Sequence, residues 1–253
     1  MRRGRLVLES EMIPYRAGFP PGARWLVLAP HPDDEVFGPG ATLAEAARRG
    51  IPVHVVVATD GAAQGDPDGR EAEARAAAHA LGLGEPEFWR FPDRGLDQAG
   101  RTLRLAILHA LQRWQPELVL APSPVELHPD HRALALALQR ALRRWSWLGA
   151  RRRPPHWVAA YEVGTALQPN LLVAVDATWE NKQDAARCHA SQLEFVPYGE
   201  VMEALTVWRR LTLTGVAHAE AFHVTTAVHV ARVSARRWAA RMGAPGYLER
   251  RRA

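Results

Sequence analysis

The sequence predicts an α/β fold, with a mostly parallel sheet that carries helices on both faces. Short apolar runs typical of strands alternate with amphipathic stretches typical of helices along most of the 253 residues. Polar clusters follow two of the apolar runs directly, at the kind of position where open parallel sheets bind ligands. Hydrophobic residues make up 47% of the chain, which is enough to build a core.

The elements are predicted from short apolar runs and from helical spacing. Strands are expected where apolar runs are bounded by turn residues, at 25–29, 53–59, 87–91, 117–122, 156–162, 171–176 and 219–224. Helices are expected between them, the first two closed by glycine, at 41–49, 70–81, 102–114, 131–145, 177–193 and 198–211.

The charge distribution separates a near-neutral body from a basic tail. The net charge is +5, and 228–253 contributes +6 through seven arginines and one glutamate, so 1–227 carries about −1 (5 minus 6). We therefore expect one catalytic domain over 1–227 and a basic C-terminal helix, from 228 to 242, within a tail over 228–253. A nucleic-acid-binding protein would show basic residues with interleaved aromatics across the fold, so we expect no nucleic-acid partner.

Three interpretations of the basic tail stay open. It is expected to pack on the body, to form a contact in a homo-oligomer, or to serve as an arm attracted to anionic glycolipid. The apolar face of the tail is too thin for a firm membrane anchor, which favours packing or oligomerisation. In either case the tail is expected to be dispensable for the chemistry.

Cysteine content and hydropathy indicate the compartment. Cys188 is the one cysteine, so an intrachain disulfide is excluded. The longest apolar run near the N-terminus has three residues, fewer than the roughly 7–15 of a secretory signal. No run reaches the roughly 20 apolar residues of a membrane span. We expect a soluble, cytoplasmic protein that is not transmembrane.

Two ionisable clusters follow predicted strands. "LVLAPHPDDEVFGPG" at 26–40 places one histidine and three carboxylates within five residues, just past a strand end, and "PSPVELHPDHR" at 122–132 follows another strand. Both contain His-Pro-Asp, in which proline stiffens the turn that carries the polar side chains. Although the clusters lie about 100 residues apart, their common position at strand ends predicts that they converge in space.

Histidines and carboxylates in this combination indicate a metal site. Two histidines and one carboxylate, with a fourth position open for water, form a ligand set of catalytic zinc. Zinc lowers the pKa of its water from about 15.7 to about 7, and a second carboxylate can then act as general base. The same ligand set also matches non-haem iron. The residues therefore predict one divalent metal per chain, Zn²⁺, Fe²⁺ or another.

Both motifs carry a family resemblance. "APHPDDEVFGPGATLA" at 29–44 and "HPDHRALA" at 128–135 resemble the PIG-L/LmbE family of zinc-dependent N-deacetylases, and the similarity extends over about 25–224. The resemblance implies a Rossmann-like α/β domain with its site at the C-terminal ends of the strands. It also implies removal of an acetyl group from an N-acetylglucosamine-type unit of a small amino-sugar conjugate.

The resemblance assigns the metal ligands and the base by position. His31, Asp34 and His131 correspond to the residues that bind Zn²⁺. Asp33 corresponds to the general base. Replacing Asp33 is therefore expected to slow the chemistry more than it weakens metal binding.

Further roles also come from the resemblance. His128 corresponds to the residue that stabilises the oxyanion or protonates the leaving amine, with Asp130 as its orienting partner. Arg70 is placed near hydroxyl or phosphate groups of the substrate, although a surface ion pair with a neighbouring glutamate would also explain an arginine there. Glu126 stands where some family members have a tyrosine that assists catalysis, so this auxiliary role is not expected here.

Other functions remain open at this point. An amidase for a non-sugar or thiol-conjugate amide would use the same machinery. A metal phosphoesterase usually needs more ligands, because it holds two metals. A metal-binding protein without turnover would have no use for Asp33, an unligated carboxylate beside the metal.

Overall fold

The computed structural model describes residues 16–145 and 155–243, and this part of the chain forms one eight-stranded sheet. The strands are β1 (Arg16–Ala17), β2 (Trp25–Ala29), β3 (Val53–Thr59), β4 (Glu87–Phe91), β5 (Leu118–Pro122), β6 (Trp157–Tyr161), β7 (Leu171–Ala174) and β8 (Ala219–Thr226). Their order across the sheet is β1-β7-β8-β6-β5-β2-β3-β4. The predicted strands are all present, with ends that shift by at most two residues.

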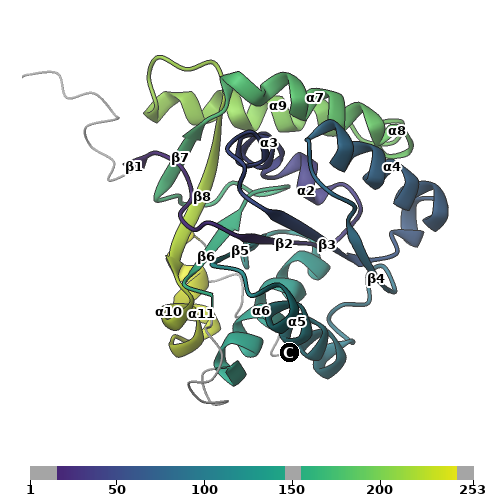
Figure 1. Cartoon of the computed structure of the whole chain (residues 1–253), viewed down its shortest axis with the longest axis vertical. Coiled ribbons are helices and arrows are strands. Elements are labelled where there is room, and N and C mark those ends of the chain that lie inside the picture. The colour runs from purple at the N-terminus through teal and green to yellow at the C-terminus, as the bar shows by residue number, and fades with distance from the viewer. Residues whose placement is uncertain (1–15, 146–154, 244–253) are drawn as a thin grey trace, which may run out of the picture.

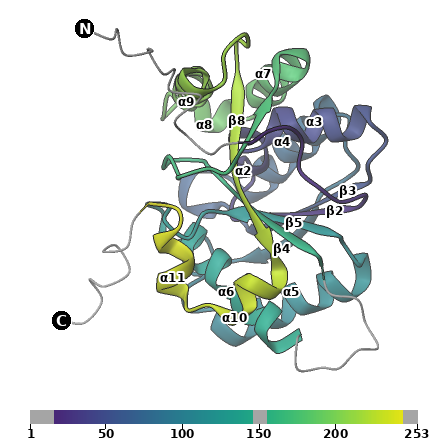
Figure 2. The ribbon, with the colours of Figure 1, turned by 90° about the vertical axis from the view of Figure 1, so that its left-hand side faces the viewer.

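Helices cover both faces of the sheet (Figures 1 and 2). One face carries α2 (Asp34–Phe37), α3 (Gly40–Arg48), α4 (Pro67–Ala80), α7 (Trp179–Cys188), α8 (Ala190–Leu193) and α9 (Tyr198–Trp208). The other carries α5 (Gly100–Trp114), α6 (Pro129–Trp145), α10 (Ala227–Arg232) and α11 (Ala235–Ala240). Within the described ranges, every helix is too short or too polar to cross a membrane.

Strand β2 shows why its sequence is apolar throughout. Leu26 and Leu28 pack into the cluster that includes residues of α5 and α6, whereas Trp25 and Val27 pack into the cluster on the α3 side. Successive side chains of a strand point to opposite faces, so a strand with helices on both sides needs apolar residues at every position. The two core layers therefore meet at this strand.

The strand order creates a switch point in the middle of the sheet. Strand β2 pairs in parallel with β3 on one side and with β5 on the other. The chain first builds β3 and β4 outward from β2, and then returns to add β5 on the opposite side. Loops that leave the carboxyl ends of β2 and β5 therefore open a crevice between them, where ligands bind in folds of this type.

The sheet is mostly parallel, as predicted, but one strand runs against the others. Strand β8 pairs antiparallel with both β6 and β7. The remaining neighbours are parallel. The mixed sheet confirms the predicted α/β class.

Two predicted helices are interrupted. The helix expected over 177–193 ends at Cys188, and α8 starts after His189, which has a non-helical backbone (ψ 52°). The single helix expected over 228–242 is wrong, because Val233 and Ser234 are extended and separate α10 from α11. The Ser234 side chain accepts a hydrogen bond from the backbone N–H of Arg237 and so starts the second helix.

The helices after β8 belong to the core. Val230, Trp238 and Met242 are at most 1% exposed and join the cluster that contains the apolar face of α6. The domain boundary expected after residue 227 falls inside α10. Removing the whole segment would expose this core, so packing on the body is the interpretation that the structure favours. The remainder of the tail, 244–253, lies outside the described residues.

A buried ion pair anchors the start of α3. Glu220 of β8 accepts hydrogen bonds from the backbone N–H groups of Ala41 and Thr42. The Nζ of Lys182 donates to Glu220, over 2.6 Å, and to the carbonyl oxygen of Gly38, also over 2.6 Å. Both charged groups of this pair therefore have partners, and the pair fixes the segment that follows the "HPDDE" motif.

Candidate active site

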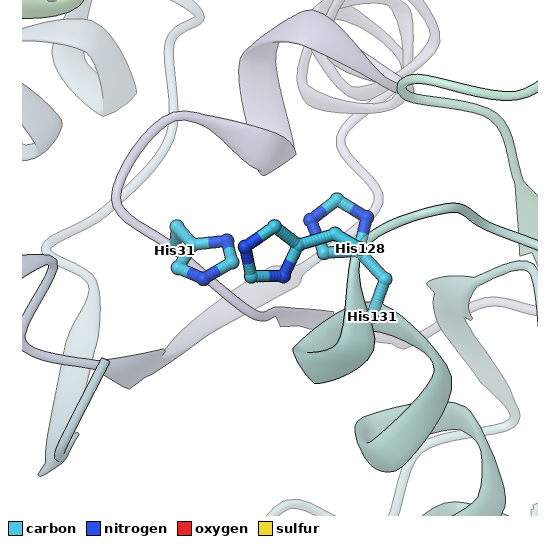
Figure 3. A group of neighbouring side chains, drawn as sticks. All are labelled: His31, His128 and His131. Atoms are coloured by element: carbon cyan, nitrogen blue, oxygen red, sulfur yellow. The ribbon is translucent and has the colours of Figure 1, made fainter. Parts of the chain in front are cut away.

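The two His-Pro-Asp motifs meet at the carboxyl ends of β2 and β5. His31 follows β2, while His128 and His131 lie at the start of α6, after β5. The three imidazole rings gather in the space between these elements (Figure 3), and one nitrogen of each lies within 4.8 Å of the others. The convergence predicted from strand-end positions is therefore present.

Asp34 lies between two of the histidines. Its Oδ2 is 3.1 Å from Nδ1 of His31 and 3.2 Å from Nε2 of His131. Ligand atoms held at about 2.0–2.1 Å in tetrahedral geometry are about 3.3 Å apart, so these two distances match the edges of a zinc coordination tetrahedron. The residues assigned as ligands by resemblance thus have donor atoms in a suitable arrangement for a metal.

The charges around Asp34 favour a cation beside it. Burial lowers the pKa of His131, but the Asp34 carboxylate outweighs it and raises the pKa to about 9. Burial raises the pKa of Asp34, yet His131 and His31 hold it well below its usual range. In the absence of metal, protonated imidazole supplies the positive charge that the carboxylate needs.

The far nitrogen of His31 faces two further carboxylates. Its Nε2 is 3.3 Å from Asp130 Oδ2 and 3.2 Å from Asp93 Oδ1. Asp130 is itself held by the backbone N–H groups of Arg94 and Leu96. Burial raises the pKa of Asp93, but the hydrogen bond from His31 lowers it to about 2. These carboxylates keep the proton on Nε2, which leaves Nδ1 free to face Asp34 and a metal.

His128 is held by its neighbour through the backbone. The N–H of Asp130 donates to Nδ1 of His128 over 3.2 Å, so the neutral ring carries its proton on Nε2. Burial, together with His31 and His131, lowers the pKa of His128 to about 4. The structure therefore places Asp130 beside His128 as expected, but directs its carboxylate to His31.

Arg70 pairs with the predicted base. Its NH2 group donates to Asp33 Oδ2 over 2.8 Å and to the carbonyl oxygen of Pro32, and its NH1 group donates to that of Gly61. The Arg70 side chain is 3% exposed, so the alternative of a surface pair does not hold; Glu71 pairs instead with other arginines. Burial and Asp34 raise the pKa of Asp33 to about 6, against the opposing effect of Arg70.

A cavity of about 390 Å³ gives access to these groups. Asp33, Asp34 and the three histidines line it together with Arg70 and Asp93. Its walls come from separate loops and helices, with residues Phe37, Ala63, Gln64, Leu127, Val163, Gly164, Gln192 and Tyr198. The volume lies in the range of small-molecule sites, about 300–1,000 Å³.

Sequence reasoning missed Asp93 altogether, and it missed the contacts that Glu126 makes with the loop after β6. Asp93 follows the strand at 87–91 in the tripeptide "FPD", a third proline–carboxylate pair at a strand end. That position could have identified it. The contacts of Glu126 with the loop after β6 depend on packing between distant segments, and nothing in its local sequence indicates them.

Comparisons with known proteins place the chain beside known deacetylases. The family model described as PIG-L, GlcNAc-PI de-N-acetylase, matches residues 26–142, a range that contains both His-Pro-Asp motifs. A diacetylchitobiose deacetylase of Thermococcus kodakarensis is 29% identical over 187 residues, which span 66% of this chain and 69% of the relative. A probable N-acetyl-alpha-D-glucosaminyl L-malate deacetylase 2 of Bacillus anthracis is 28% identical, over 66% of this chain and 80% of the relative.

A solved structure extends the similarity to most of the chain. The conserved protein TT1542 from Thermus thermophilus superimposes with a TM-score of 0.69 and 32% identity. The match covers 79% of this chain and 93% of that protein. The agreement therefore includes strands beyond the segment that the family model matches.

Proposed function

Because the chain belongs to the PIG-L family, we propose that it is a zinc-dependent N-deacetylase that releases acetate from an N-acetylglucosamine-type conjugate. The observation that carries the proposal is the meeting of His31, Asp34 and His131 around one point, with Asp33 beside it. A ligand set with a neighbouring unligated carboxylate is the arrangement that metal-assisted amide hydrolysis needs.

The donor set fits a single divalent metal. We propose that His31 Nδ1, Asp34 Oδ2 and His131 Nε2 would hold it, since Asp34 Oδ2 lies within 3.2 Å of both nitrogens and the far nitrogen of His31 faces other carboxylates. When bound, the metal supplies Lewis acidity that polarises the amide carbonyl and makes a water molecule more acidic. Zinc is favoured over iron by the family resemblance.

Asp33 and His128 would then move and stabilise charge. Asp33 accepts a proton from the attacking water as the new C–O bond forms, and Arg70 keeps its carboxylate in place. The Nε2–H of His128 donates to the carbonyl oxygen, where negative charge collects. As the C–N bond breaks, the proton held by Asp33 passes to the leaving nitrogen, directly or through His128. The products are a free amine and acetic acid, which loses its proton to solvent and leaves as acetate.

The substrate is proposed to be an amino-sugar conjugate in the cytoplasm. Both relatives named above are deacetylases of such compounds by their names. Gln64, Gln192 and Arg70 line the cavity and offer polar groups to sugar hydroxyls. The group attached to the sugar would meet Leu127, which is 62% exposed beside the same cavity.

A panel of substrates tests this proposal. Free and conjugated N-acetyl amino sugars, non-sugar amides and phosphate esters are incubated with the zinc-loaded protein, and acetate, amine and phosphate are measured. Acetate release from at least one amino sugar is expected. Turnover of non-sugar amides alone would favour an amidase, and phosphate release alone would favour a phosphoesterase.

Elemental analysis tests the ligand set. His131→Ala is expected to lose most of its bound metal, because one of three ligands is removed. His109→Ala, which replaces an exposed histidine of α5, is the matched control and is expected to keep one metal per chain. Full metal retention in His131→Ala would contradict the assignment.

A further inference from the structure

Glu126 lies in the loop between β5 and α6, two residues before His128, and is 1% exposed. We infer that Glu126 is a positioning residue that joins the cavity wall at 163–165 to the ring of His131. Its carboxylate anchors the wall by hydrogen bonds and orients His131 toward the metal. The second part rests on the proposed metal site, whereas the first is independent of it.

The anchoring of the wall is visible in three hydrogen bonds. Oε1 of Glu126 accepts from the backbone N–H groups of Val163, over 2.8 Å, and Thr165, over 3.3 Å. Oε2 accepts from the N–H of Gly164 over 3.1 Å. Hydrogen bonds to an ionised acceptor are roughly twice as strong as neutral ones, so one buried carboxylate fixes three consecutive residues.

Two of the same three residues line the cavity. Val163 and Gly164 belong to its lining, together with Arg70 and Gln64. A Cβ atom at Gly164 would lie 3.5 Å from Glu126 Oε2, which is ordinary van der Waals contact. The wall therefore rests directly on Glu126.

The carboxylate also lies on the far side of His131. Nε2 of His131 faces Asp34, while its Nδ1 is buried and has no hydrogen-bond partner among the residues that the structure describes. Oε2 of Glu126 is 3.8 Å from this Nδ1, beyond the roughly 2.7–3.2 Å of a hydrogen bond. A metal-bound imidazole carries its proton on the far nitrogen and gives it to an acceptor, often a carboxylate.

Counting acceptor sites explains why this carboxylate suits both tasks. An ionised carboxylate offers about four lone-pair sites. Three are used by the loop N–H groups, and the remaining one is available to Nδ1–H of His131 on the Oε2 side. A small approach of the ring would complete the set, and it would select the tautomer in which Nε2 is free for the metal.

Glu126→Gln separates these contributions with little change in shape. The amide oxygen is expected to take the Oε1 position, where it keeps the hydrogen bonds from Val163 and Thr165. The NH₂ group then takes the Oε2 position, so the Gly164 N–H and Nδ1–H of His131 both lose their acceptor. We expect the Kd for Zn²⁺ to rise about 10- to 100-fold, measured by competition with a chromophoric chelator. The ¹⁵N spectrum of labelled histidine in the zinc-loaded protein is expected to place the wild-type proton on Nδ1 of His131.

A measurement without metal tests the wall. Amide hydrogen exchange at 163–165 in the metal-free protein is expected to be at least about tenfold faster in Glu126→Gln than in wild type, since an exchange-protecting acceptor is lost. Unchanged exchange would overturn the anchoring. If the wild-type protein bound no Zn²⁺, the proposed function and the orienting task would fail, and the exchange rates would still decide the anchoring.

Glu162→Gln is the matched control. Glu162 is 5% exposed and starts the same loop, but its carboxylate accepts from the N–H of Leu167 and from Arg209. This variant is expected to be less stable while its Kd for Zn²⁺ stays within about twofold of wild type, because it does not contact a proposed ligand. An equal loss of zinc affinity in Glu162→Gln and Glu126→Gln would reduce Glu126 to general support of the fold and contradict the orienting task.

A shorter acid provides a second variant. Glu126→Asp keeps the charge, but its carboxylate cannot reach both the loop and His131. If Glu126→Gln does not fold, Glu126→Asp takes its place, with an expected loss of zinc affinity of at least about tenfold. Wild-type affinity in a folded Glu126→Asp would contradict the proposal.

Discussion

Two buried groups of charges lie on either side of the short helix α2, and they differ in balance. Behind it, Lys182 pairs with Glu220. The Glu220 carboxylate also accepts hydrogen bonds from the backbone N–H groups at the start of α3. In front of it, the described surroundings of the cavity contain a single buried guanidinium, that of Arg70. The buried carboxyl groups there are more numerous and include those of Asp33, Asp34, Glu35, Asp93, Glu126 and Asp130.

The difference indicates which group is structural and which is functional. Burying a charge is costly unless it is paired, so a balanced pair can be explained by the fold alone. An excess of buried carboxylate needs another source of positive charge. In the metal-free protein the histidines supply it, which explains the raised pKa of His131; in the functional protein we propose that the metal does.

The largest effect is expected for Asp33→Asn. The amide has nearly the same shape but cannot accept the proton of water, so kcat is expected to fall about 100- to 10,000-fold. The three proposed ligands are untouched, and the zinc content is expected to remain one per chain. Acetate release and elemental analysis on the same sample measure both quantities.

A loss of zinc in Asp33→Asn would weaken the distinction between the structural ion pair and the functional cavity. Asp33 would then belong to the ligand set, and the fall in activity would carry no information on proton transfer. Arg70→Lys serves as the control for geometry, since it keeps a cation near Asp33 but not the three directed hydrogen bonds. It is expected to lose less activity than Asp33→Asn.

Most of the fold could be predicted from the sequence because the strands carry apolar residues for both core layers. Runs such as 25–29 and 53–59 are apolar at nearly every position, and the observed bounds of β2 and β3 agree with the prediction. The antiparallel direction of β8 and the breaks at His189 and Val233 were not predictable. Partners distant in the sequence determine them: Gln139 and Arg143 of α6, for example, donate to the carbonyl oxygen of Val233.

The site was predictable where the chemistry is local. His31, Asp33 and Asp34 lie within four residues of the sequence. The family resemblance, which rests on this motif together with the one at 128–135, adds His131 to them. Asp93 and the contacts of Glu126 depend on which loops meet above the sheet, and a side chain's partner across such a gap leaves no trace in its own segment. The direction of the Asp130 carboxylate, toward His31, has the same origin.

The second largest effect is expected behind α2, for Lys182→Met. Burial lowers the pKa of Lys182, and Glu220 opposes this, so removing the ammonium leaves a buried carboxylate without its cation. Breaking a buried pair in this way costs about 3–5 kcal/mol of unfolding free energy, on the order of 10 °C in Tm for a chain of this size. Thermal unfolding measures it, and kcat at a temperature where the protein is folded is expected to change less than about tenfold, because the pair touches none of the reacting groups.

The double variant Lys182→Met/Glu220→Gln sharpens this result. With both charges gone and one acceptor oxygen kept for the start of α3, the loss of stability is expected to be smaller than in Lys182→Met alone. A folded Lys182→Met protein as inactive as Asp33→Asn would show instead that the two groups of charges work as one site.

The smallest effect is expected from adding metal to the wild-type protein. Zinc that binds the folded chain at about 100 times its Kd stabilises it by about 2.7 kcal/mol, because binding draws the equilibrium away from the unfolded state. The gain should persist in Lys182→Met, whose altered pair lies away from the ligands, and disappear in Asp34→Asn, which removes the carboxylate shared by His31 and His131. Thermal unfolding with zinc and with a chelator, for the three proteins side by side, measures it. An equal rise in Tm for Asp34→Asn would place the stabilising metal elsewhere on the chain, and the carboxylate excess in the cavity would need a different cation.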